Sequence, residues 1–159
     1  MPSILFICTA NRYRSPIAEA CFIAEMNKNQ EKNQAWDISS AGTWTENGLP
    51  AIQDAIQKAQ LLGLDIQEHR SRIVTAELLK NTDMVIVMEQ GQKEALQNEF
   101  LQDAEKIFLL SEVTVGLAYD IPDPVIKKDV GDIPKEICDL IHRYYAKIVE
   151  IVMVRTDAL

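Results

Sequence analysis

The chain begins with an uninterrupted apolar run, residues 3–8 (SILFIC), which is the pattern of a short strand buried in a parallel sheet. Residues 9–14 then have the composition of a tight loop. Ser15 and Pro16 predict a helix start, with Ser15 as the N-cap and proline at the first helical position. Small and apolar residues recur at helical spacing immediately afterwards. The N-terminal segment therefore predicts a strand, a tight loop and a helix.

The remaining sequence continues this alternation. We expect three more strands, at 36–40, 84–88 and 106–110, and helices at 51–62, 75–80, 90–100 and 133–152. Strands that alternate with helices indicate a parallel sheet covered on both sides. The prediction is thus an α/β fold, a four-stranded parallel sheet with helices on both faces, in a single domain over residues 1–159. Ligand sites of such folds lie at the carboxyl ends of the strands.

Composition limits the classes of function. With 16 Lys and Arg against 24 Asp and Glu, the net charge is −8, which argues against a nucleic-acid surface. No apolar run approaches the ~18 residues that cross a bilayer, and nothing resembles a signal peptide. We therefore expect a cytoplasmic protein that binds neither nucleic acid nor membrane.

The three cysteines, Cys8, Cys21 and Cys138, are odd in number and widely spaced. That pattern predicts neither a disulfide framework nor a zinc site, and we expect Cys21 and Cys138 to be core residues. The chain has only two histidines, His69 and His142, so we expect no metal centre. Nothing in the sequence indicates a cofactor.

The loop after the first strand has the form Cys-x5-Arg-Ser. Backbone N–H groups of such a loop converge on one point, and the dipole of the following helix favours an oxyanion there. The residues that would form this phosphate cradle are Thr9, Ala10, Asn11, Arg12, Tyr13, Arg14 and Ser15.

Individual side chains of this loop fit phosphate chemistry. The cradle would stabilise a thiolate at Cys8, and Arg14 offers a planar two-donor fork to phosphate oxygens. The Ser15 hydroxyl would lie near the sulfur, and Asn11 suits a left-handed backbone position. Cys8 could instead be an ordinary buried strand residue and Arg14 a solvated charge. The strand–loop–helix context favours the catalytic interpretation.

A general acid is also needed, because the leaving oxygen of a phosphate ester requires a proton. Asp123 lies between two prolines in YDIPDP, residues 119–124, and each proline restricts the backbone around it. A carboxyl on such a stiff loop could be aimed at the cradle. The segment could equally be an acidic turn, and Asp120 is a local competitor that lacks a following proline.

The segment CTANRYRSPIAEA, residues 8–20, resembles the phosphate-binding loop and first helix of the low-molecular-weight protein tyrosine phosphatase family. The resemblance continues at SAGT (40–43), HRSR (69–72), residues 83–88 and IPDP (121–124). It implies that Cys8, Arg14 and Asp123 are the catalytic residues. It also implies a supporting hydrogen-bond network, formed by Ser15, Asn11, Ser40 and His69.

Several positions depart from the family's pattern. Tyr13 stands where relatives often have a second cysteine, and Ala10 replaces the usual glycine. Arg12 brings a cation to the substrate entrance, where it would repel a guanidinium leaving group. Val125 replaces the aromatic residue that follows the Asp-Pro pair, although Trp44, or Tyr13, can supply an aromatic ring. We expect Arg12, Trp44 and Val125 to line the substrate cleft.

The resemblance implies hydrolysis of phosphotyrosine in protein substrates through a phosphocysteine intermediate, with inorganic phosphate as product and no cofactor. One alternative is a phosphate-binding module of low activity. Another is an arsenate reductase-like enzyme, which needs further cysteines to relay a disulfide. Residues 81–90, where such relatives place them, contain no cysteine.

Overall fold

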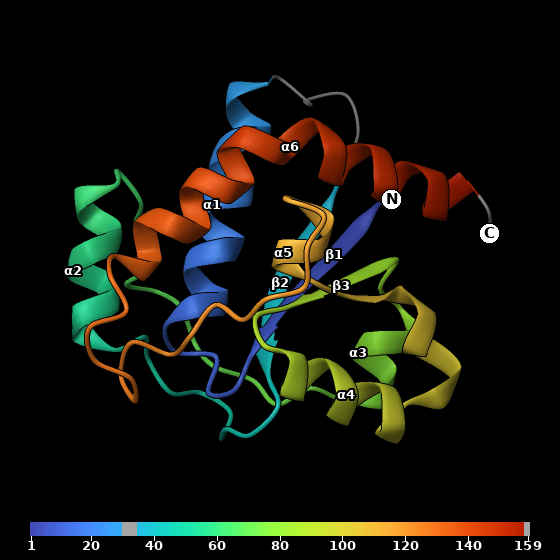
Figure 1. Ribbon diagram of the computed structural model, residues 1–159, viewed down its shortest axis with the longest axis horizontal. Helices are drawn as coiled ribbons and strands as arrows, with labels where there is room; N and C mark the ends of the chain where they lie inside the picture. Colours follow the sequence, from blue (N-terminus) through green and yellow to red (C-terminus); the bar gives the residue numbers. More distant parts are fainter. Residues whose placement is uncertain (30–34, 158–159) are drawn as a thin grey trace.

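The computed structural model describes residues 1–29 and 35–157. Its four strands form one parallel sheet in the order β2–β1–β3–β4 (Figure 1). The strands are β1 (Ser3–Cys8), β2 (Asp37–Gly42), β3 (Met84–Val87) and β4 (Ile107–Leu109). The predicted fold class is therefore confirmed, and β2 runs on through Gly42, two residues beyond its predicted end.

Helices join the strands and cover both sides of the sheet. They are α1 (Arg14–Lys28), α2 (Gln53–Leu61), α3 (Ala76–Lys80), α4 (Gln90–Glu99), α5 (Leu110–Val113) and α6 (Ile133–Asp157), with a 3-10 helix at Leu101–Lys106. The sequence did not indicate α5 or the 3-10 helix. The predicted N-cap was also wrong: α1 begins at Arg14 with Tyr13 as N-cap, so Ser15 lies inside its first turn.

The alternation of side chains along β1 separates two hydrophobic cores. Ile4 and Phe6 face the α1 and α6 side, where Phe22 packs its ring 5.3 Å from that of Tyr145. Leu5 and Ile7 point to the opposite core, with apolar residues of α3, α4 and β4. Because successive strand residues point to opposite faces, a run buried on both faces must be apolar throughout.

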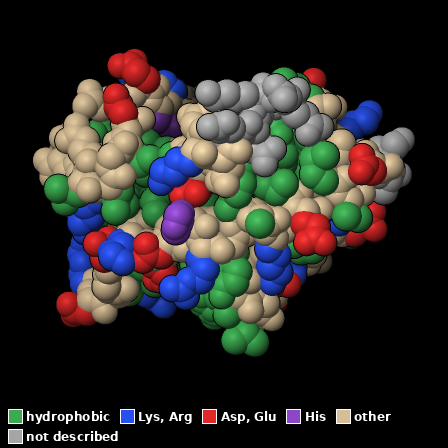
Figure 2. Space-filling model, turned by 90° about the horizontal axis from the view of Figure 1, so that it is seen from above, with side chains coloured by type: hydrophobic (Ala, Val, Ile, Leu, Met, Phe, Trp, Pro, Cys, Tyr) green, Lys and Arg blue, Asp and Glu red, His purple; other side chains and the backbone are tan. Residues whose placement is uncertain are grey.

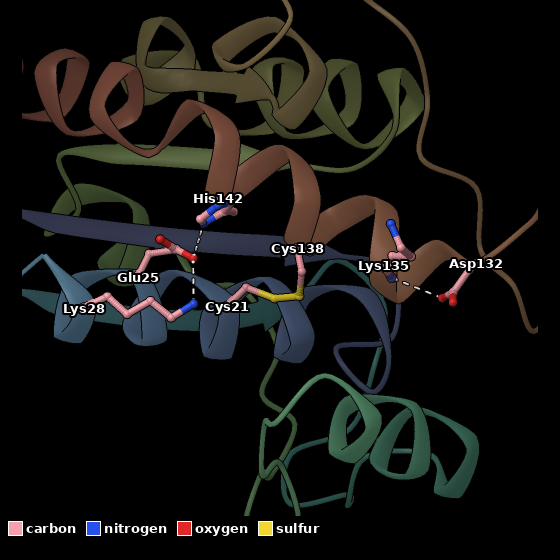
Figure 3. Close-up of a disulfide and its surroundings, with 7 residues drawn as sticks. All are labelled: Cys21, Glu25, Lys28, Asp132, Lys135, Cys138 and His142. Carbon is pink, nitrogen blue, oxygen red and sulfur yellow. Dashed lines mark hydrogen bonds and ion pairs between the residues drawn. A yellow bond between two sulfur atoms is a disulfide. The ribbon is translucent and has the colours of Figure 1, made fainter.

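Contrary to the sequence prediction, Cys21 of α1 and Cys138 of α6 form a disulfide (Figure 3). The two residues are 117 positions apart, but the helices pack side by side and bring their Cα atoms to 5.6 Å, a normal separation for a bonded pair. Cys21 is buried as expected. The odd number of cysteines argued against a disulfide, but it reflects one free cysteine, Cys8, beside one bonded pair.

The outer surface over α1 and α6 mixes both signs of charge with apolar side chains (Figure 2). Within the described residues, no helix combines the length and apolar character needed to cross a membrane.

Candidate active site

The loop after β1 is built so that its backbone curls around one point. Asn11 adopts the left-handed conformation, with φ of 56°, as predicted for an asparagine in such a loop. Gly42, at the end of the neighbouring strand β2, allows the loop to approach closely, since a Cβ there would lie 2.6 Å from the Thr9 carbonyl oxygen. Thr43 and Trp44 then donate backbone N–H groups to the carbonyls of Cys8 and Thr9.

Cys8 ends β1 with its thiol facing the loop. Its Sγ lies 3.0 Å from Ser15 Oγ and accepts the backbone N–H of Asn11 at 3.3 Å. These contacts are available because Ser15 belongs to the first turn of α1 rather than capping it. Two polar groups are thus directed at the sulfur. The predicted approach of the Ser15 hydroxyl to the sulfur is therefore confirmed.

Asn11 is fully buried and connects the loop to neighbouring segments through hydrogen bonds. Its Nδ2 donates to Ser15 Oγ at 2.8 Å, and its Oδ1 accepts the backbone N–H of Arg72 at 3.0 Å. Its carbonyl oxygen lies 2.7 Å from His69 Nε2. The predicted contact of His69 with the loop is thus present, and every polar group of the Asn11 side chain has a partner.

Ser40 supports the loop indirectly. Its hydroxyl donates to Glu19 Oε2 at 2.7 Å, and its carbonyl accepts Arg72 Nε at 2.9 Å, so Arg72 links Ser40 to Asn11. Burial raises the pKa of Glu19, opposed by the Ser40 hydrogen bond and by the charges of His69 and Arg72. Neither Glu19 nor Arg72 was recognised from the sequence as a part of this network.

Arg14 is almost fully buried. Its Nη1 donates to the Ile121 carbonyl at 2.8 Å and pairs with Glu89 Oε2 at 2.9 Å. Its Nη2 lies 3.7 Å from Asp123 Oδ2. The loop and the YDIPDP segment, which are far apart in the sequence, therefore meet at this guanidinium.

Asp123 and Asp120 have different surroundings, although they share one loop. Asp123 is partly exposed beside Arg14, and its Oδ1 accepts the backbone N–H of Val125. Asp120 instead accepts the backbone N–H of Gln90 at the start of α4, at 2.8 Å. Of these two carboxyls, the structure brings Asp123 to the cradle, while Asp120 joins its loop to α4.

The residues expected at the substrate entrance differ in exposure. Arg12 directs Nε to the Pro50 carbonyl at 2.8 Å, and Trp44 projects from the adjoining loop with 84% of its surface exposed. Val125 is also exposed. Tyr13 is buried and donates to Asp54 Oδ2 at 2.7 Å. Its ring therefore belongs to the core, and burial raises its pKa. It does not provide an aromatic wall for substrate.

Two further polar residues at the carboxyl end of β3 were missed. Glu89 pairs with Arg14, and Gln92 donates from Nε2 to Thr9 Oγ1 at 3.0 Å and to Glu89 Oε2 at 3.2 Å. The available signal was their position: polar residues that follow a buried parallel strand lie at the edge where ligands bind.

Comparison with known proteins agrees with this geometry. The family described as low molecular weight phosphotyrosine protein phosphatase matches residues 3–156. A probable low molecular weight protein-tyrosine-phosphatase, EpsP of Ralstonia nicotianae, is 30% identical, with 79% of this chain and 80% of that protein covered. A protein-arginine-phosphatase of Bacillus subtilis is 32% identical, with 76% and 78% covered.

The solved structure of the low molecular weight protein tyrosine phosphatase from T. tengcongensis superposes with a TM-score of 0.77 at 31% identity. The alignment covers 94% of this chain and 99% of that one, so the sheet, the loop and the helices on both faces are shared. The chain belongs to the low-molecular-weight phosphotyrosine protein phosphatase family of cysteine-dependent hydrolases.

Proposed function

We propose that this protein hydrolyses phosphotyrosine in protein substrates through a phosphocysteine intermediate. One observation supports this above the others: Arg14, which ends the loop that follows Cys8, contacts the Ile121 carbonyl and the Asp123 carboxylate of the segment that carries the candidate acid. A nucleophile, an oxyanion-binding cation and an acid are thereby gathered at one end of the sheet, which is the set that phosphate-ester hydrolysis requires.

In the first step the Cys8 thiolate attacks phosphorus. The S–P bond forms as the P–O bond to tyrosine breaks, and the Asp123 carboxyl gives its proton to the departing phenolic oxygen. Arg14 and the N–H groups of the loop stabilise the equatorial phosphoryl oxygens. The partial exposure of Asp123 suits a group that must meet a large leaving group from solvent.

In the second step water attacks the phosphocysteine. Asp123, now a carboxylate, takes a proton from this water, the S–P bond breaks, and inorganic phosphate leaves. The Ser15 hydroxyl, 3.0 Å from Sγ, stabilises the thiolate as it is released. Asn11, Ser40 and His69 hold the loop in shape throughout.

The family includes relatives named for tyrosine and for arginine phosphatase activity, and the entrance favours the former. Arg12 is a fixed cation at the rim, held by the Pro50 carbonyl, and it repels a guanidinium leaving group. The exposed face of Trp44 offers a surface on which a phenol ring can stack. Val125 contributes a smaller apolar contact.

The decisive experiment measures phosphate release from p-nitrophenyl phosphate, a phosphotyrosine peptide and a phosphoarginine peptide, with wild type beside Cys8→Ser. We expect wild-type turnover of the first two substrates, little turnover of the third, and none in the variant. Full activity in Cys8→Ser would refute the mechanism. A wild type that binds phosphopeptide but shows no turnover between pH 5 and 8 would instead indicate a phosphate-binding module.

The same preparation tests the arsenate alternative. A disulfide relay needs thiols near the nucleophile, but Cys21 and Cys138 are bonded to each other. We therefore expect no thiol-dependent reduction of arsenate. Sustained arsenate turnover would contradict the proposed function.

A further inference from the structure

Glu89 is a carboxylate placed directly against the cation of the phosphate cradle. It lies at the start of α4, and its Oε2 is 2.9 Å from Arg14 Nη1. Its side chain is about three-quarters buried, with 28% exposed. The mechanism proposed above gives this carboxylate no part, because it is neither the nucleophile nor the acid.

The contacts of Arg14 divide its guanidinium into an anchored side and a free side. Nη1 is occupied by the Ile121 carbonyl and by Glu89. Among the described residues, no hydrogen bond is made by Nε, and Nη2 has only the Asp123 carboxylate at 3.7 Å. A planar guanidinium binds an oxyanion best through two parallel N–H groups. Anchoring Nη1 leaves the Nε and Nη2 edge for phosphate.

Glu89 is itself held in place by Gln92, which is buried. Gln92 Oε1 accepts the backbone N–H groups of Met88 and Glu89, both at 3.0 Å. Its Nε2 donates to Glu89 Oε2 and to the hydroxyl of Thr9 in the phosphate loop. The carboxylate that fixes Arg14 is therefore tied to the loop that surrounds the phosphate.

We propose that Glu89 is the positioning residue for Arg14, and that its charge also limits how tightly the cradle holds free phosphate. The second effect follows from charge: a carboxylate beside the cation partly cancels the attraction for a dianion. Glu89 thus favours the transition state, through orientation, while it weakens binding of the product. This inference rests on the proposed phosphatase function.

The test compares Glu89→Gln and Glu89→Ala with wild type by kcat, KM and competitive inhibition by inorganic phosphate. We expect kcat to fall on the order of tenfold to a hundredfold in Glu89→Ala, because Arg14 loses its orientation. Glu89→Gln keeps an oxygen that can accept from Nη1, so its kcat falls less. Phosphate should inhibit both variants several-fold more strongly than wild type.

Glu94→Gln is the matched control, because it removes one charge from the exposed side of α4. It should leave kcat and phosphate inhibition unchanged. Thermal unfolding of each variant verifies that the fold is retained. Opposite changes in kcat and in phosphate affinity distinguish positioning from structural damage, which would weaken both.

Two outcomes would overturn the proposal: kcat and phosphate inhibition both within twofold of wild type, or a parallel loss of both in a folded Glu89→Gln. Calorimetry with inorganic phosphate separates this proposal from the proposed function, because it needs no turnover. If wild type proved inactive, tighter phosphate binding by Glu89→Gln would still support the charge effect, and unchanged or weaker binding would refute it.

Discussion

The loop that precedes α1 and the middle of α1 show two different uses of cysteine. At the N-terminal end, Cys8 faces a polar network in which the Asn11 N–H and the Ser15 hydroxyl lie within 3.3 Å of its sulfur. Midway along the helix, Cys21 lies in the hydrophobic core and is bonded to Cys138. The first environment directs polar groups at the sulfur of a free cysteine, whereas the second joins two helices. Changes at the first region should affect turnover, and changes at the second should affect stability.

After Cys8→Ser, the largest effect should come from Arg14→Lys. A lysine keeps the charge but cannot present two parallel N–H donors to phosphate, and its single nitrogen cannot both replace Nη1 at Ile121 and Glu89 and leave a second nitrogen for phosphate. We expect kcat to fall by ~10² to 10³, the range seen when an oxyanion donor is removed. Arg143→Lys, on the exposed surface of α6, should have no effect. Equal activity of both variants would show that the fork geometry is unimportant.

Asp123→Ala should slow turnover by ~10² or more, as expected for loss of a general acid. The comparison with Asp120→Asn is informative because both carboxyls belong to one loop. Asp120 accepts a backbone N–H from Gln90, a bond that an asparagine oxygen can keep, so its kcat should change by no more than about threefold. Steady-state kinetics with a phosphotyrosine peptide measures both. A larger loss in Asp120→Asn would reassign the acid.

The sequence predicted the region around Cys8 well and the region around Cys21 poorly, for a physical reason. The Cys8 loop is a local motif: strand, loop and helix lie within one short segment, so their spacing in the sequence is also their arrangement in space. The left-handed Asn11 and the Ser15 contact followed from that spacing. The strands of the sheet could be predicted equally well, because strands buried in a parallel sheet appear in the sequence as continuous apolar runs.

Contacts between distant segments could not be predicted in the same way. The Cys21–Cys138 pair depends on how α1 and α6 pack. Tyr13, which the sequence offered as an aromatic ring for the cleft, is buried and donates its hydroxyl to Asp54 of α2. Glu89, Glu19 and Arg72 bind the loop network from three separate elements. Each is an ordinary charged residue in its own segment, so no local pattern distinguishes it.

Cys138→Ser should reverse the pattern seen at Arg14, with a loss of stability and little change in turnover. A bond that closes a loop of this length contributes up to about 5 kcal/mol in the chain-entropy treatment. Thermal unfolding without reductant should show a clearly lower Tm for the variant, while kcat at 25 °C stays within about twofold, since the disulfide lies away from the cradle. Reductant should lower the Tm of wild type but not that of Cys138→Ser. An equal Tm in both proteins would show that the cross-link contributes nothing.

The smallest effect should come from Glu19→Gln, which tests the support behind the loop. Burial raises the pKa of Glu19 in the folded protein, so folding favours its protonated form. Its contribution to stability is full at low pH and is lost as pH rises through the folded-state pKa. A glutamine is neutral at every pH and can still accept the Ser40 hydroxyl at the oxygen position. The variant should therefore gain stability relative to wild type as pH rises from 4 to 7, by a few degrees in Tm at most. A Tm difference between variant and wild type that stays constant across this pH range would contradict this expectation. It would mean that the charges of His69 and Arg72 fully offset the cost of burying the carboxylate. A loss of kcat without a change in Tm would mean that the charge itself, rather than the hydrogen bond, holds the loop.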